Sequence, residues 1–215
     1  FLSEQLSTFW SDWAKVANDP GATAPRAVLM QDAATVASTL NSMSTSLSDV
    51  GAAAAQSLST DVSSANTAAG QLDSVNTQIA IATATGTSIN SLLDQRDALL
   101  GHLSQLVGGA ATINANGTAD VTVGGQPLVS AATSSSPSVV NTITVDSSAT
   151  TPSTMVSVGG TAVSLDGGST AASVNTLTTT LPTVQSQLDD VATALASAVN
   201  TVQASGYDLT GAAGT

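Results

Sequence analysis

The sequence predicts a mainly α-helical protein, an elongated helical bundle or rod with one long heptad-patterned helix and a small β-rich insertion. Apolar residues first recur at alternating spacings of four and three, which is typical of a helix that buries one narrow seam. After residue 110 the period changes to two, as in half-buried strands, and helical spacing returns in the last third of the chain. These observations predict helices that flank an inserted β-rich segment.

The first helix is predicted over residues 1–18. Four of the five aromatic residues of the chain lie on it, and Phe9, Trp10 and Trp13 crowd one face. The breaker residues that follow, Asn18-Asp19-Pro20-Gly21, end the helix. We expect the aromatic group to pack against the last helix. A surface that faces a partner protein is the alternative, because exposed aromatic side chains mark interfaces.

The long helix is predicted from Pro25 to Thr83. Pro25 suits a first helical turn, where a missing N–H costs little. The seam spacing shifts by one residue after Ala54, which indicates a stutter. Gly51 and Gly70 each weaken the helix and mark a close helix contact or a slight bend. A helix of this length would span about 85–90 Å and needs another helix along it for stability. The seam consists of Val36, Leu40, Met43, Leu47, Val50, Ala54, Leu58, Val62, Ala65, Ala69, Leu72 and Ile79.

A shorter helix is predicted over residues 88–107 and ends at Gly108-Gly109. It carries Asp94, Arg96 and Asp97 in a chain where basic residues are scarce. The two aspartates share a face, and Arg96 is displaced around the helix. We expect an ion pair that locks this helix to a neighbouring helix or to an adjacent subunit. The alternative is a solvated charge cluster that contributes under about 1 kcal/mol.

The β-rich insertion is predicted over residues 110–166. Asn116-Gly117 lies between two alternating segments, which is the strongest short signal for a hairpin. Gly159-Gly160 indicates a second hairpin, and residues 139–145 read as one additional strand. The expected strands are 112–115, 119–123, 139–145, 155–158 and 161–165.

The last third of the chain is predicted to be a helix with Pro182 in its first turns and Ser205-Gly206 at its end. We expect it to return and pack on the first helices. The predicted organisation is therefore a helical N-terminal part of the rod (1–109), the insertion (110–166) and the returning C-terminal helix (167–215).

The charge of the chain excludes two classes of partner. Three Lys and Arg residues face fifteen Asp and Glu residues, and the formal net charge is −12. Nucleic-acid binding and polybasic attachment to a membrane surface both need clustered basic residues, so we expect neither. The chain contains no run of about 18 apolar residues, so we expect no insertion into a membrane. The acidity favours solubility and repulsion between copies.

No catalytic, cofactor-binding or metal site is predicted. The chain has no cysteine, which removes thiolate ligands and cysteine nucleophiles. His102 is the only histidine, and no nucleophile-elbow pattern accompanies it, so it reads as a structural or surface residue. Asn114, Asn116 and Asp120 resemble part of a calcium loop, but the strand-like flanks favour a hairpin turn. We therefore expect no enzyme and no cofactor.

Several motifs occur in a specific order. The segment 90–97 (NSLLDQRD) is accompanied by 6–13 (LSTFWSDW) with 25–29 (PRAVL), by 120–129 (DVTVGGQPLV) and by the end of the chain, 181–211. Each motif alone is weak. Together they resemble the family of flagellar hook-associated protein 1 over nearly the whole chain.

The resemblance implies a structural subunit of the bacterial flagellum, in the junction layer between hook and filament. Its implied partners are other copies in a ring-like layer, the hook protein, and the second junction protein, hook-associated protein 3. It also implies an extracellular location reached by flagellar type III export without a cleaved signal, which is consistent with the lack of a signal-peptide pattern.

Two alternatives remain open. One is another axial protein, flagellin or the second junction protein, because these proteins share a helical rod design. The other is a secreted adhesin or a type III translocator that binds a host surface.

Overall fold

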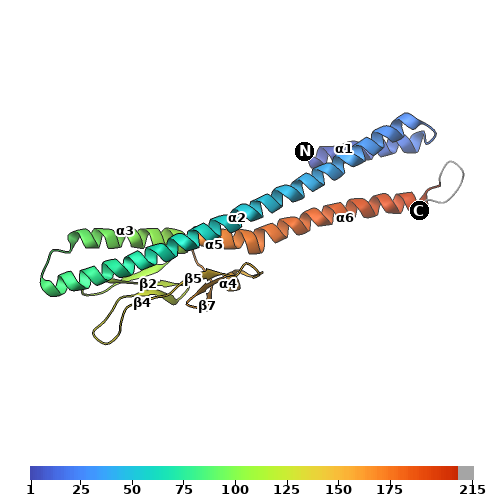
Figure 1. Cartoon of the computed structure of the whole chain (residues 1–215). Helices are drawn as coiled ribbons and strands as arrows, with labels where there is room; N and C mark the ends of the chain where they lie inside the picture. Colours follow the sequence, from blue (N-terminus) through green and yellow to red (C-terminus); the bar gives the residue numbers. More distant parts are fainter. Residues whose placement is uncertain (208–215) are drawn as a thin grey trace. The chain divides into compact units, whose positions relative to one another are not determined.

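The computed structural model describes residues 1–207. The chain is mainly helical and contains one 63-residue helix, α2 (Thr23–Thr85), and small antiparallel sheets, which confirms the predicted fold class (Figure 1). It forms two compact units: Phe1–Val50 with the chain from Pro182 onward, and Gly51–Leu181. The division at residues 109/110 and 166/167 stays a prediction.

The first unit contains three helical segments. Helix α1 (Leu2–Asn18) and the first part of α2 are joined by a short turn, and α6 (Leu181–Ser205) supplies the third segment. Helix α2 begins two residues before Pro25, which thus lies in the first turn, where its missing N–H leaves no helical hydrogen bond unmade. Phe9 and Val36 are buried in this unit.

The second unit combines the rest of α2 and α3 (Asn90–Val107) with two sheets and several short helical segments. The first sheet has the order β1-β2-β3-β4 and the second β5-β6-β7, with every neighbouring pair antiparallel. The strands are β1 (Ala110–Ile113), β2 (Ala119–Val123), β3 (Gln126–Ser130), β4 (Val139–Val140), β5 (Ile143–Val145), β6 (Val156–Val158) and β7 (Thr161–Val163). The short helices are α4 (Pro152–Met155) and α5 (Gly168–Asn175), and a π-helical turn, η1 (Thr176–Thr180), follows α5.

One hydrophobic core holds the second unit together. Both sheets contribute to it, along with α2, α3 and α5. Burial alternates along β2, as the period of two predicts for a strand with one covered face. The largest fully buried side chains of this unit are Leu72, Ile79, Leu103, Leu128 and Ile143.

The two predicted hairpins are confirmed, but the additional strand is wrong. Residues 139–145 form β4 and β5, which belong to different sheets. The chain changes sheets at Asn141, whose backbone N–H donates to Leu128 while its side-chain amide donates to the Pro127 carbonyl at 2.7 Å. The next residue, Thr142, already accepts from Gly159 of the second sheet. Alternating apolar residues do not reveal such a change, because both halves keep the period of two.

Helix α6 begins at Leu181, so Pro182 lies in its first turn, as predicted. Helical conformation also precedes it, because α5 starts at Gly168 and continues through η1 into α6. The N–H of Leu181 donates to the Thr176 carbonyl, five residues back. Proline has no N–H and its ring clashes with the carbonyl four residues earlier, and the wider π turn accommodates both effects.

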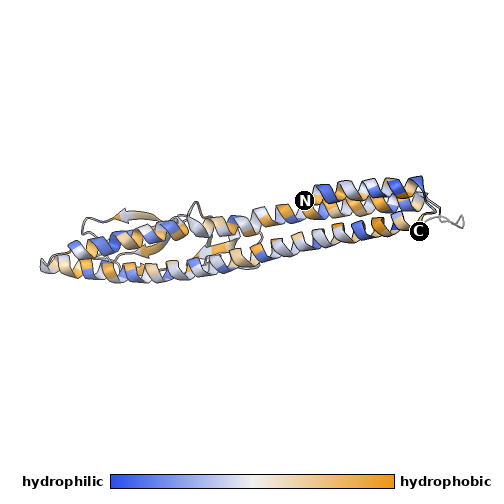
Figure 2. Ribbon diagram, turned by 90° about the horizontal axis from the view of Figure 1, so that it is seen from above, coloured by the Kyte–Doolittle hydropathy of each residue, from blue (hydrophilic) through white to orange (hydrophobic). Residues whose placement is uncertain are grey.

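The seam of α2 is buried unevenly. Most of its members beyond residue 58 are buried, whereas Met43 is 42% exposed and Val50 is 51% exposed. Figure 2 shows hydrophobic residues recurring along the whole helix, so the uneven burial reflects what covers the seam.

The two glycines within α2, Gly51 and Gly70, have different surroundings. A Cβ on Gly51 would lie 3.3 Å from Cδ1 of Leu181, a close contact, but a Cβ on Gly70 would meet nothing within 4 Å.

Candidate functional site

The aromatic group of α1 forms a compact cluster. The ring centroids of Phe9 lie 5.1 Å from Trp10 and 5.7 Å from Trp13, both in edge-to-face arrangements that aromatic pairs favour. Phe9 is buried and Trp10 is 39% exposed. Phe9 and Trp13 line a cavity of about 570 Å³ together with Leu195 and Val199 of α6. Whether the exposed part of the cluster meets a partner stays a prediction.

A pair of carboxyl groups lies between α1 and α2. Asp12 is buried, and Lys15 Nζ donates to its Oδ1 at 2.5 Å. This hydrogen bond lowers the pKa of Asp12 and raises the pKa of Lys15. A hydrogen bond with Asp12, together with burial, raises the pKa of Asp32. The sequence analysis missed this pair, because no periodic signal links two carboxylates on separate helices.

Arg96 joins α3 to the hairpin turn between β1 and β2. Its side chain is 10% exposed, and Nε and Nη2 donate to Oδ1 of Asp97 at 2.9 and 2.7 Å. Nη1 donates to the carbonyl of Gly117, 21 residues along the chain. Asp94 is exposed and forms no ion pair with Arg96 in the described part of the chain. The contact within the chain is therefore to a β turn, and contacts to another subunit stay a prediction.

Two asparagines of α2 hold the two sheets. Asn76 donates to the Ala119 carbonyl at 2.7 Å and accepts from the Ala119 N–H at 2.8 Å. Asn66 does the same for Ile143, at 2.9 and 2.8 Å. Each side-chain amide thus pairs with the backbone of the first residue of a strand, β2 or β5, as a neighbouring strand would. Sequence analysis missed both residues. Their only signal was a polar residue close to an apolar seam.

The residues that resemble a calcium loop serve the first hairpin. The side-chain amide of Asn114 donates to Thr118 Oγ1 at 3.1 Å and to Asp120 Oδ2 at 3.3 Å. Asn116 Oδ1 accepts from the N–H and hydroxyl of Thr118. These bonds are those of a turn, as predicted. Among residues 1–207 no group of three or more His, Cys, Asp or Glu side chains could hold a metal ion.

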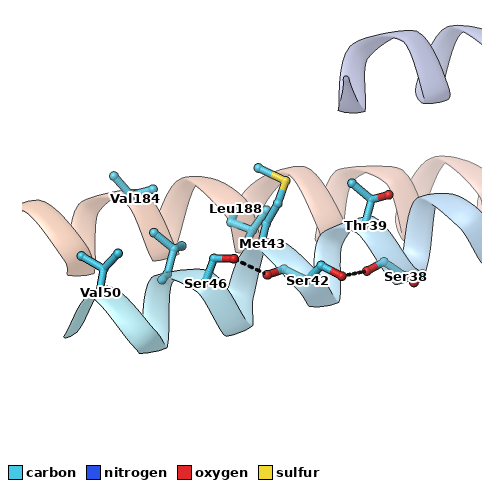
Figure 3. Close-up of a pocket in the computed structure, with 9 residues that line it drawn as sticks. Ser38, Thr39, Ser42, Met43, Ser46, Val50, Val184 and Leu188 are labelled. Atoms are coloured by element: carbon cyan, nitrogen blue, oxygen red, sulfur yellow. Dashed lines mark hydrogen bonds between the residues drawn. The ribbon is translucent and has the colours of Figure 1, made fainter. Parts of the chain in front are cut away.

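An open groove lies between α2 and α6 within the first unit (Figure 3). Its volume is 440 Å³, and most of its exposed lining surface is apolar. Met43, Val50, Val184 and Leu188 supply the apolar part, and Ser38, Ser42 and Ser46 form one edge. The hydroxyls of Ser42 and Ser46 each donate to the carbonyl four residues earlier, at 2.9 Å.

Comparison with known proteins identifies the family. A family model described as the helical domain of the flagellar hook-associated protein FlgK matches residues 1–215. The chain belongs to the FlgK helical-domain family. Its relatives include flagellar hook-associated protein 1 of Bacillus subtilis, 31% identical over 131 residues, and that of Escherichia coli, 34% identical over 154 residues. The matches cover 57% and 67% of this chain but only 26% and 27% of these relatives.

The FlgK motifs fall on defined elements. The segment 90–97 forms the first half of α3 and includes Arg96, and 120–129 forms the hairpin of β2 and β3. The motif at the end of the chain is described as far as Tyr207, and its Asp208, Leu209 and Gly211 lie outside the described residues. No helix in the described part of this FlgK domain is long and apolar enough to cross a membrane.

Proposed function

We propose that this chain is part of a structural subunit of the bacterial flagellum that forms the junction layer between hook and filament. The match of the FlgK helical-domain model to all 215 residues carries the proposal. The proposed role is mechanical and not enzymatic: the domain holds its place in an assembly and transmits force.

The bonds between helices and sheets support a mechanical role. Arg96, Asn66 and Asn76 each bond to the backbone of a strand or turn, so the sheets are attached to the helices at separate points. Backbone groups keep a fixed position in a sheet, and hydrogen bonds to them resist sliding better than contacts between mobile side chains. A load on α2 or α3 would therefore reach both sheets without a change of register.

The proposed partners are other copies of the chain in a ring-like layer, the hook protein on one side and hook-associated protein 3 on the other. The proposed location is outside the cell, on the flagellum, after type III export without a cleaved signal. These assignments follow from the family, whose curated members carry the name flagellar hook-associated protein 1.

The test is binding of the full-length protein that carries this domain to purified hooks. We expect it to decorate the distal hook end and to be required before hook-associated protein 3 binds there. Lateral decoration of the hook, or equal binding to filament ends and hook ends, would contradict the junction assignment. Binding to host-cell surfaces in the absence of hook binding would favour an adhesin instead.

A further inference from the structure

The turn between β1 and β2 contains Asn116-Gly117, the one place in the chain where glycine follows asparagine. The side-chain carbonyl carbon of an asparagine can be attacked by the backbone nitrogen of the next residue, which closes a five-membered ring. A side chain on that next residue hinders the attack, and glycine has none. Asn116 is exposed, so water reaches it. The sequence therefore makes Asn116 the asparagine of this chain most open to such an attack.

The fold holds the reacting atoms within one hydrogen-bonded turn. The backbone N–H of Thr118 donates to Oδ1 of Asn116 at 3.1 Å, two residues earlier, which is an Asx turn. The atoms that this hydrogen bond closes into a loop include Cγ and Cβ of Asn116 and the backbone nitrogen of Gly117. These are members of the ring that the attack would form. The side chain of Asn116 is therefore folded toward the peptide bond whose nitrogen would attack it.

Hydrogen-bond donors lie at both oxygens on which negative charge develops. Thr118 Oγ1 donates to Asn116 Oδ1 at 2.7 Å in addition to the Thr118 N–H, so two donors would stabilise the oxyanion that the attack forms. Thr83 Oγ1 of α2 donates to the backbone carbonyl of Asn116 at 3.4 Å. This carbonyl oxygen shares the charge when the Gly117 nitrogen loses its proton, because both atoms belong to one conjugated peptide group. The turn thus adds polarising groups to a reactive sequence.

Two hydrogen bonds oppose the reaction and set its pace. The N–H of Gly117 donates to the Asn114 carbonyl at 2.9 Å and must leave this acceptor before its proton can pass to a base. Arg96 Nη1 donates to the Gly117 carbonyl and further restrains the turn. The reaction therefore proceeds only from brief local openings of the turn, and it is slow.

We propose that Asn116 is a site of covalent self-modification, at which the chain converts this residue to aspartate or isoaspartate. The Gly117 nitrogen gives its proton to hydroxide or another base and bonds to Asn116 Cγ, and the side-chain nitrogen takes up a proton and leaves as ammonia. Water then adds to one carbonyl carbon of the cyclic imide and breaks its bond to the Gly117 nitrogen. Opening at Cγ gives aspartate, and opening at the backbone carbonyl carbon gives isoaspartate. The modification is independent of the proposed junction role.

The two products have different effects on the fold. Aspartate at position 116 leaves the backbone unchanged and can accept the same two hydrogen bonds from Thr118. Isoaspartate lengthens the backbone by one carbon atom, in a turn that the bond from the Asn114 N–H to the Thr118 carbonyl closes. The added atom displaces the Gly117 carbonyl, which is the acceptor of Arg96. The isoaspartyl product therefore releases α3 from the hairpin, whereas the aspartyl product keeps this contact.

Mass spectrometry of peptides tests the site. The full-length protein that carries this domain is incubated in water enriched in heavy oxygen, and each converted asparagine then carries one heavy oxygen atom. We expect conversion at Asn116 before any other asparagine of this chain. It should be at least about tenfold faster at about pH 8.5 than at about pH 6, because the Gly117 nitrogen must lose a proton. Asn116→Gln should stay unconverted at this position, since its attack would close a larger ring.

Three results would overturn the proposal. They are a chain that stays intact at the higher pH, another asparagine of this chain that reacts first, and equal rates of conversion of Asn116 at both pH values.

Two variants of Thr118, which is 1% exposed, test the donors. Thr118→Val keeps the shape of the side chain and removes its hydroxyl, whereas Thr118→Ser keeps the hydroxyl. We expect Thr118→Val to convert Asn116 at least about threefold more slowly than Thr118→Ser does. Far-UV circular dichroism checks that both variants fold. An equal or faster rate in Thr118→Val would contradict the role of the hydroxyl.

Urea unfolding separates the effects of the two products. Protein converted at Asn116 contains the isoaspartyl form, and Asn116→Asp reproduces the aspartyl form alone. We expect the converted protein to unfold at a lower urea concentration than Asn116→Asp, because only isoaspartate displaces the acceptor of Arg96. Equal midpoints would contradict the release of α3 from the hairpin.

Discussion

Replacing Asn76 with Ala tests whether α2 holds the first sheet through one side chain. Asn76 is 2% exposed, and its amide makes both hydrogen bonds to Ala119, which is itself fully buried. The substitution removes both bonds and leaves the N–H and carbonyl of Ala119 without a partner. Each buried backbone group without a hydrogen bond costs about 1–3 kcal/mol. We therefore expect a loss of about 2–4 kcal/mol in the free energy of unfolding. The loss stays below the full sum for two unpaired groups, because a water molecule that reaches them restores part of the hydrogen bonding.

Urea unfolding followed by circular dichroism measures this loss. With a slope of about 1–3 kcal/mol per molar urea, the midpoint should fall by about 1–2 M. Asn41→Ala is the matched control, since Asn41 is exposed on the same helix, and we expect it to change stability by at most about 0.5 kcal/mol. Equal midpoints for the two variants would refute the reasoning.

A second variant separates the two bonds. Asp at position 76 can still accept from the Ala119 N–H, but an ionised carboxylate cannot donate to the Ala119 carbonyl. Asn76→Asp should therefore be destabilised at neutral pH and recover part of its stability when the carboxyl is protonated. Hydrogen exchange provides the local readout: the Ala119 amide should lose protection in Asn76→Ala and keep more of it in Asn76→Asp.

Three further predictions concern other contacts. Arg96→Ala removes the bond from α3 to the Gly117 carbonyl and should lower the free energy of unfolding by about 1–3 kcal/mol, whereas unchanged urea unfolding would favour the solvated cluster. The pKa of Asp32 is raised, so the contribution of Asp32 to stability is present at low pH and is lost as the pH rises through its folded pKa. The pKa of Asp12 is lowered, so the contribution of Asp12 is lost as the pH falls. Asp32→Asn should thus raise the melting temperature relative to wild type at pH 7, with a smaller difference near pH 4, and a pH-independent difference would contradict the raised pKa of Asp32. Gly124→Ala should cost at least about 1 kcal/mol in thermal unfolding, because Gly124 has φ +55° and a Cβ there would lie 2.7 Å from the Ser164 carbonyl oxygen.

Local patterns predicted the elements of the fold better than the contacts between them. The heptad spacing predicted α2, and the dipeptides Asn116-Gly117 and Gly159-Gly160 predicted two hairpins, because helix periods and turn chemistry act within a few residues. The change of sheet at Asn141 was not predictable in this way. It depends on a side-chain bond to Pro127, which becomes adjacent only when the sheet has formed.

The candidate site shows the same limit. The scarcity of basic residues singled out Arg96, but its acceptor is a carbonyl in the β1–β2 turn. Every residue has a backbone carbonyl, so the composition cannot indicate which one accepts the bond. Asn66 and Asn76 look like ordinary polar residues of a long helix until two strands start opposite them. The exposure of Met43 was also not predictable from the sequence. A residue of the heptad seam indicates that another segment should cover it, but the pattern does not identify that segment.

The positions of Asn66 and Asn76 on α2 fix the distance between the points at which the two sheets are attached. At 1.5 Å per residue, ten residues of helix place the two anchor points about 15 Å apart, and the pitch also sets the direction in which each amide points. Insertion or deletion of a single residue between them would turn one anchor by about 100° away from its strand. Lengthening this stretch of helix should therefore be far less tolerated than lengthening the loop at residues 131–138, where additional residues alter neither anchor.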